Sequence, residues 1–199
     1  MPHPGGNVTG FIDIEASLSG KWIETLKDIV PNFSRAVLMF NPGTAPVSYF
    51  LPAFEAAART SAIEPIAAPV RTVADTEHLF ASLGDNPKTG VVLMPDSFTG
   101  KRSNLDLVVS LAASYRVPTV YPYRYMVAAG GLISYGVDPV DLFRRTPTYV
   151  DRILKGANPA ELPIQLPTKF EMAINLKTAR LLGLDIPATL LGRADEVIE

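Results

Sequence analysis

The segment that decides the fold is residues 130–187, GGLISYGVDPVDLFRRTPTYVDRILKGANPAELPIQLPTKFEMAINLKTARLLGLDIP. Its hydrophobic pattern predicts, in order, a strand at 132–135, a helix at 140–155, a proline-rich connector at 158–167, a strand at 170–175 and a helix at 176–182. Pro147 lies inside the longer helix and predicts a kink or a late start, because proline has no backbone N–H to donate.

Upstream of this segment, short apolar runs alternate with longer segments of helical period. The expected strands are 8–12, 36–40, 63–70, 90–94 and 118–121, and the expected helices are 15–30, 46–60, 73–83, 104–115 and 123–129. A terminal helix is expected at 187–197. Pro65 and Pro69 indicate that the third strand lies at an edge. The alternation predicts an α/β fold, a doubly wound parallel sheet covered by helices.

Composition excludes several classes of function. The chain has 199 residues, 47% hydrophobic, which suits one or two domains with a real core. A formal charge of −2 without a basic cluster argues against a nucleic-acid partner. Cysteine is absent, and there are only two histidines, His3 and His78. No nucleophile, phosphate-loop or zinc motif occurs, so we expect no catalytic residue, no metal site and no cofactor.

Ligands of parallel α/β sheets bind beyond the carboxyl ends of the strands. Asp96 follows a strongly apolar strand, so its carboxylate could hold a ligand ammonium; the alternative is an N-cap for the next helix. Ser97 and Phe98 share its turn. Asn41 follows another buried strand and could bind a ligand, although Asn-Pro-Gly is also favourable turn chemistry.

Tyrosines alternate in the sequence YPYRY, at positions 121, 123 and 125. Such rings offer stacking area and a hydroxyl to a ligand, and Tyr121 and Tyr123 are the candidates for a cleft wall. Packing of the chain segment is an equally good interpretation of any one of them. Tyr135 and Gly136 follow the strand at 132–135, where glycine permits a close backbone approach.

Residues 130–187, together with PGGNVTGF at residues 4–11, resemble the ABC transporter substrate-binding proteins of the tryptophan/tyrosine type, which have a type I periplasmic-binding fold. The resemblance implies two lobes that close on a hinge around a small-molecule ligand, an amino acid or a related compound, without chemistry. It also implies an ABC permease as partner, a periplasmic location, and a place for Tyr135 and Gly136 beside the cleft and hinge.

The chain departs from that family in one respect: PGGNVTGF lies in mid-chain there, so most of the first lobe has no counterpart here. We expect a ligand-binding lobe at 1–122, a crossover segment of the mostly absent other lobe at 123–157, and a return strand with helices at 158–199. The strand at 132–135 and its helix would then lack their usual neighbours. Exposed apolar area of that kind predicts a homodimer.

Other functions stay open. A truncated lobe could dimerise and bind ligand weakly or not at all, and a ligand-sensing domain would share the fold, although no basic helix-turn-helix segment precedes it. An enzyme is disfavoured because Asp96 has no evident base partner. The opening residues, MPHPGG, show no export signal. The protein would therefore be cytoplasmic if the chain is the full product.

Overall fold

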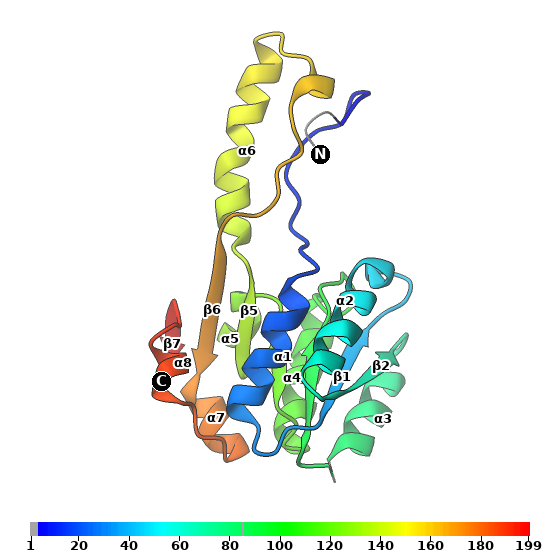
Figure 1. Cartoon of the computed structure of the whole chain (residues 1–199), viewed down its shortest axis with the longest axis vertical. Coiled ribbons are helices and arrows are strands. Elements are labelled where there is room, and N and C mark those ends of the chain that lie inside the picture. Colours follow the sequence, from blue (N-terminus) through cyan, green and yellow to red (C-terminus); the bar gives the residue numbers. More distant parts are fainter. Residues whose placement is uncertain (1–3, 85) are drawn as a thin grey trace. The chain divides into compact units, whose positions relative to one another are not determined.

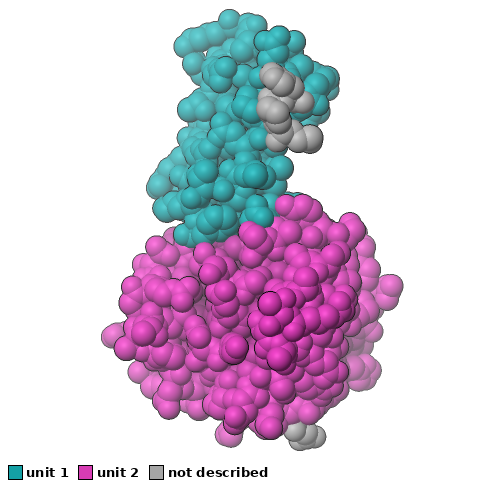
Figure 2. Space-filling view, viewed as in Figure 1, with its two compact units in different colours: residues 1–15, 137–170 teal, residues 16–136, 171–199 magenta. Residues whose placement is uncertain are grey.

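A computed structural model of the chain describes residues 4–84 and 86–199, so His3 lies outside the described residues. Two units are distinguished (Figure 2): unit 1 is the described part of residues 1–15 with residues 137–170, and unit 2 is residues 16–136 with 171–199. The elements are α1 (Leu18–Ile29), β1 (Arg35–Phe40), α2 (Val47–Thr60), β2 (Glu64–Pro69), α3 (Val73–Leu83), β3 (Thr89–Leu93), α4 (Arg102–Ser114), β4 (Thr119–Tyr121), α5 (Arg124–Ala128), β5 (Ile133–Val137), α6 (Pro139–Leu154), a 3₁₀ turn (Pro159–Glu161), β6 (Phe170–Asn175), α7 (Leu176–Leu182), α8 (Ala188–Leu191) and β7 (Glu196–Ile198).

Unit 2 is built around a seven-stranded sheet in the order β2-β1-β3-β4-β5-β6-β7 (Figure 1). The pairs β1–β2, β1–β3, β3–β4, β4–β5 and β6–β7 are all parallel. The predicted α/β class and doubly wound sheet are therefore confirmed. The proline-containing strand β2 is an edge, as its sequence predicted, because proline cannot donate to a ladder on both sides.

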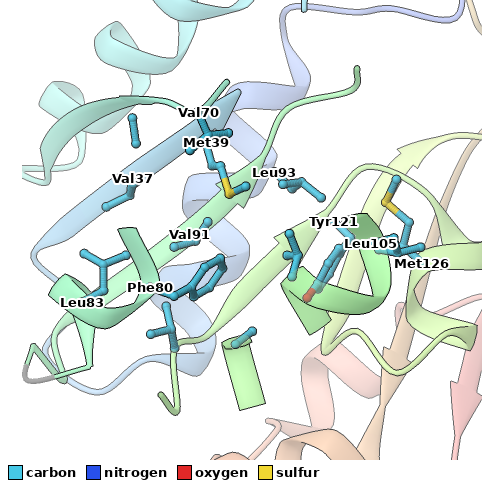
Figure 3. Packing of buried hydrophobic residues seen from close by; sticks show 14 residues of the cluster. Val37, Met39, Val70, Phe80, Leu83, Val91, Leu93, Leu105, Tyr121 and Met126 are labelled. Carbon is cyan, nitrogen blue, oxygen red and sulfur yellow. The ribbon is translucent and has the colours of Figure 1, made fainter. Parts of the chain in front are cut away.

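Helices cover both faces of this sheet. On one face, alternate residues of β1 and β3 join a buried cluster with Phe80 from α3 and Leu105 from α4 (Figure 3). On the other face, Trp22 of α1 stacks on Phe50 of α2 with ring centroids 5.5 Å apart, and both are fully buried. Strands buried on both faces explain the nearly continuous apolar runs of the sequence.

Local capping sets several helix ends. Thr72 and Asp75 form a capping box at the start of α3, which begins at the predicted residue. Asn175 accepts from the Thr178 N–H at the start of α7, and Gly183 ends that helix with a left-handed φ of 70°. The predicted bounds of β6 and α7 are confirmed for this reason.

Three predicted elements differ from the structure. The strand expected at 8–12 is wrong: only Phe11 forms an isolated bridge, to Gln165 in the connector. The terminal helix ends at Leu191, because the chain beyond it joins the sheet as β7; the backbone N–H of Asp195 donates to Met172 O and its side chain accepts from Met172 N. The strand expected to lack neighbours, β5, instead pairs with β4 through Val120 and Tyr121.

Unit 1 consists of the long helix α6, residues up to 15 and the connector that precedes β6. Asp138 caps α6 by accepting from the N–H groups of Val140 and Asp141, and Pro139 stands in the first turn. A late start after Pro147 is therefore wrong, since the helix begins at Pro139 and continues through Pro147.

The two compact units group residues by contact, and they do not test the lobes expected at 1–122, 123–157 and 158–199. Residues 123–136, which include α5 and most of β5, group with the large sheet, and the connector up to residue 170 groups with α6. The ladder between β4 and β5 fixes this strand to the sheet.

Candidate functional site

The order β2-β1-β3 places the reversal of strand order between β1 and β3. In doubly wound sheets this switch point opens a crevice at the carboxyl ends of the two strands, where ligands bind. Asn41 directly follows β1, and Asp96 follows β3 after two residues. The two predicted site residues therefore flank the switch point of unit 2.

The Asp96 carboxylate joins these two turns. Its Oδ1 accepts from the Thr99 N–H at 2.7 Å and from the Thr44 hydroxyl at 3.4 Å, while its Oδ2 accepts from the Asn41 N–H at 3.2 Å. The alternative role as N-cap of the next helix is wrong, because α4 begins only at Arg102. Asp96 thus holds the turn after β1 against the turn after β3.

Asn41 is 8% exposed and closes its own turn, because its Oδ1 accepts from the Gly43 N–H at 2.9 Å. No described residue accepts from its amide Nδ2, which leaves two donors at the carboxyl edge of the sheet. In the neighbouring turn, Ser97 is exposed, and Phe98 is half-buried and packs against the core cluster.

The three tyrosines of YPYRY have different surroundings. Tyr121 is 1% exposed in the core cluster, and burial raises the pKa of its hydroxyl above the ordinary range. Tyr123 and Tyr125 stack on each other with centroids 5.7 Å apart and ring planes 13° apart. Tyr125 is half exposed, and partial burial raises its pKa. For Tyr121, the packing interpretation is the one that the structure supports.

Tyr125 also belongs beside the Asp96 turn. A Cβ on Gly100 would lie 3.4 Å from the Tyr125 hydroxyl oxygen, so the ring reaches the end of that turn. The alternation of YPYRY was the only sequence signal for this residue, and it did not distinguish the ring that reaches the turn from the ring that enters the core.

Tyr135 and Gly136 lie at the end of β5. The indole N–H of Trp22 donates to Tyr135 O at 2.7 Å, and a Cβ on Gly136 would lie 1.8 Å from Pro122 O. Gly136 is therefore packed directly against the backbone that leads into Tyr123. The carboxyl edge of unit 2 thus has the turns that contain Asn41, Asp96 to Gly100 and Pro122 to Tyr125, together with Gly136 near the end of β5.

This edge provides hydrogen-bond donors, an aromatic stack and backbone turns. The described residues contain no group of three or more acidic or histidine side chains arranged to hold a metal. The arrangement is therefore suited to binding a small polar molecule with an apolar or aromatic portion.

Comparison with known proteins places this chain in a family. The profile described as ABC transporter substrate binding protein matches residues 1–198, and the chain belongs to that family. Proteins of the family bind small molecules, work with ABC permeases and typically act outside the cytoplasm. The family is solute-binding and non-catalytic.

Three solved structures are similar to the chain. A conserved domain protein from Vibrio cholerae is 25% identical, with a TM-score of 0.86, over 98% of this chain and 64% of its own. The ABC domain from Streptococcus pneumonia in complex with L-Trp is 26% identical, with a TM-score of 0.86, over 99% and 67%. A ligand-free, open substrate binding protein with adhesive properties from Clostridium difficile shares the fold at 19% identity and a TM-score of 0.73, over 100% and 65%.

The chain therefore spans 64 to 67% of the length of these structures, slightly less than two thirds for the Vibrio and Clostridium proteins. None of the curated proteins compared with the chain matches it. Within the described residues, no helix has both the length and the apolar character needed to cross a bilayer.

Proposed function

We propose that the chain is the solute-binding component of an ABC import system and binds an amino acid or a related small molecule without chemistry. The observation that carries this proposal is membership of the family over residues 1–198. The similar Streptococcus structure holds L-Trp, and the switch-point turns of unit 2 supply the polar and aromatic groups that such a ligand requires.

The residues divide into three roles. Asn41 donates from Nδ2 to a ligand carboxylate, with Ser97 as a second polar contact. The Tyr123–Tyr125 stack, Phe98 and Tyr135 form the apolar wall, and Gly136 allows the backbone near Pro122 to close in. Asp96 mainly holds the turns after β1 and β3 together, because both of its carboxylate oxygens already accept hydrogen bonds from the protein. Tyr121 supports the wall from the core.

The family also suggests where the protein acts. We place it in the periplasm with an ABC permease as partner, as is typical of the family. We also propose a homodimer, because several apolar side chains of α6 are exposed. The expected lobes stay as proposed from the sequence: a ligand-binding lobe at 1–122, a crossover segment at 123–157 and a return segment at 158–199.

Calorimetric titration of the 199-residue chain with L-tryptophan, other L-amino acids and a sugar alcohol tests the binding function. A ligand at a hundredfold excess over its Kd stabilises the native state by about 2.7 kcal/mol, so a thermal shift should accompany the heat of binding. Asn41→Ala and Tyr125→Ala should each weaken binding about tenfold or more. Tyr115→Ala is the matched control, since this partly exposed tyrosine caps the opposite end of α4.

A second candidate is a chain that folds and associates but does not bind. The exposed apolar side chains of α6 favour it, because they offer a surface for association. A cooperatively melting chain with no heat and no thermal shift for any amino acid would support this candidate and contradict the first.

A further inference from the structure

Helix α6 is amphipathic, but most of its apolar side chains face solvent. Only Leu142 and Tyr149 of the helix are buried. The exposed apolar residues are Val140 (46% exposed), Phe143 (77%), Val150 (49%), Ile153 (37%) and Leu154 (81%). By contrast, every large apolar residue of α1 is buried. An exposed apolar stripe on one helix usually marks an association surface.

The opposite side of α6 is held firmly within unit 1. Phe11 packs against Tyr149 with ring centroids 5.0 Å apart, and the Tyr149 hydroxyl donates to Pro163 O at 2.6 Å. Arg145 donates to Gln165 and Thr168, and its guanidinium lies 5.1 Å from the Phe11 ring centre. The exposed stripe is therefore displayed on an ordered helix whose other side is already filled.

We infer that two copies of this chain pair through α6 in antiparallel orientation. The stripe is complementary to itself: with a two-fold axis between residues 148 and 149, Phe143 of one copy meets Leu154 of the other, and Pro147 meets Val150. A shallow hollow runs along the stripe and is lined by Phe143, Thr146, Pro147, Val150, Asp151 and Leu154, so that in this register the Phe143 ring of each copy reaches the hollow of the other. The inference rests on the proposed homodimer and adds its contact surface and orientation.

The charges beside the stripe agree with this orientation. In an antiparallel pair the same flank of each helix meets its equivalent, so Arg144 of one copy lies near Asp151 of the other, twice per dimer. Arg144 is exposed and makes no hydrogen bond or ion pair with any described residue. Asp151 is exposed, and among the described residues its carboxylate pairs only with Lys155, one turn further along. A parallel pair would instead set opposite flanks of the two helices together, so Arg144 and Asp151 would not meet.

The stripe is narrow, so the dimer should be weak. It offers a few hundred Å² on each copy, which is below the size of standard stable interfaces. We expect dissociation in the micromolar range, and light scattering or sedimentation between about 1 and 200 μM should show a monomer–dimer equilibrium.

Phe143→Glu and Leu154→Glu should each weaken dimerisation at least tenfold, while unfolding remains unchanged because both side chains are exposed. Leu181→Glu is the matched control: it is a similarly exposed leucine on a helix of unit 2 and should leave the equilibrium unchanged. A wild-type chain that stays monomeric at 200 μM would overturn the dimer without affecting the binding function.

Orientation is tested separately. Since the chain has no cysteine, single cysteines at Thr148 and Lys155 can carry spin labels without background. At a rise of 1.5 Å per residue, the antiparallel pair separates equivalent positions along the axis by only a few ångströms at 148 and by about 20 Å at 155. Equal distances at the two positions would overturn the antiparallel pairing. Arg144→Glu and Asp151→Arg should each weaken the dimer, and the double variant should restore it; failure of restoration would contradict the charge contact.

Discussion

Gly136→Ala should be among the most destabilising alanine substitutions in the sheet. A Cβ at this position would lie 1.8 Å from Pro122 O and 2.9 Å from Pro122 C, whereas real carbon–oxygen contacts stay above about 3 Å. The obstacle is a backbone carbonyl between Tyr121 and Tyr123, so no side-chain rotation can relieve the clash. Strand β5 would have to move by more than ~1 Å away from β4.

The expected cost follows from this geometry. Overpacking of a rigid core typically costs 1 to 3 kcal/mol, and a clash with backbone belongs at the upper end, about 3 kcal/mol. For a chain of this length, that lowers Tm by roughly 6 to 12 °C. Thermal and urea unfolding followed by circular dichroism measure both quantities on the purified chain.

Gly20→Ala is the matched control, because it has the opposite expected sign. Gly20 lies inside α1 and a Cβ there would meet nothing within 4 Å, so alanine should stabilise the helix by about 1 kcal/mol. The reasoning is refuted if Gly136→Ala lowers Tm by less than 2 °C, or if the two substitutions shift Tm equally. A Cβ on Gly131 would lie 2.7 Å from the Tyr121 ring and 2.9 Å from Met126 O, so Gly131→Ala should fall between them because its backbone contact is longer than the 1.8 Å contact of Gly136.

Three further substitutions follow from local structure. Ala62 has a left-handed φ of 58° after α2, so Ala62→Gly should raise stability by about 1 kcal/mol in urea unfolding, whereas Ala56→Gly inside α2 should lower it by a similar amount. The Thr89 hydroxyl is buried and bonds no described residue, so Thr89→Val should be neutral or stabilising by up to about 1 kcal/mol; Thr178→Val, which removes a 2.9 Å bond to Gly130 O, should destabilise. The hydrogen bond from Lys169, with the N–H groups of Asp141 and Val140, lowers the pKa of Asp138. The contribution of the ionised Asp138 carboxylate to the free energy of unfolding is therefore complete above its unfolded pKa of about 3.9 and is lost as the pH falls through its lower folded pKa. The urea midpoint of the wild-type chain should decline over that acid range, and the midpoint of Asp138→Asn should decline less.

Most of the fold follows from the hydrophobic period of each segment and from the turn and capping residues between segments. The runs that became β1 and β3 are apolar on both faces, and the helices between them begin and end at residues whose turn chemistry is visible in the sequence. The errors lie where tertiary pairing overrides local pattern. Residues 8–12 have the composition of a strand, but among the described residues they form only one bridge, between Phe11 and Gln165 of the connector. Residues 196–198, expected within a helix up to residue 197, instead pair in parallel with β6.

The sequence predicts where the candidate site residues lie relative to the strand ends, but it does not predict which hydrogen bonds they make. The rule that ligands bind beyond strand ends selected Asn41 and Asp96, and their hydrogen bond places both at the switch point. The sequence does not show that the Asp96 carboxylate already accepts three hydrogen bonds. One donor, Thr99, is 3 residues away, but the other two, Thr44 and Asn41, are 52 and 55 residues away in the sequence. That occupancy moves the expected ligand contact from Asp96 to the amide of Asn41.

The sequence also does not predict which of the three tyrosines is packed in the core. Period two would place Tyr121, Tyr123 and Tyr125 on one face if the strand continued, but β4 ends at Tyr121. Tyr121 therefore points into the core, while Pro122 turns the chain so that the next two rings stack on each other. If this division is right, Tyr121→Phe should change stability little and binding little, whereas Tyr125→Phe should weaken only those ligands that accept a hydrogen bond from its hydroxyl. A larger loss of affinity in Tyr121→Phe than in Tyr125→Ala would reverse the assignment.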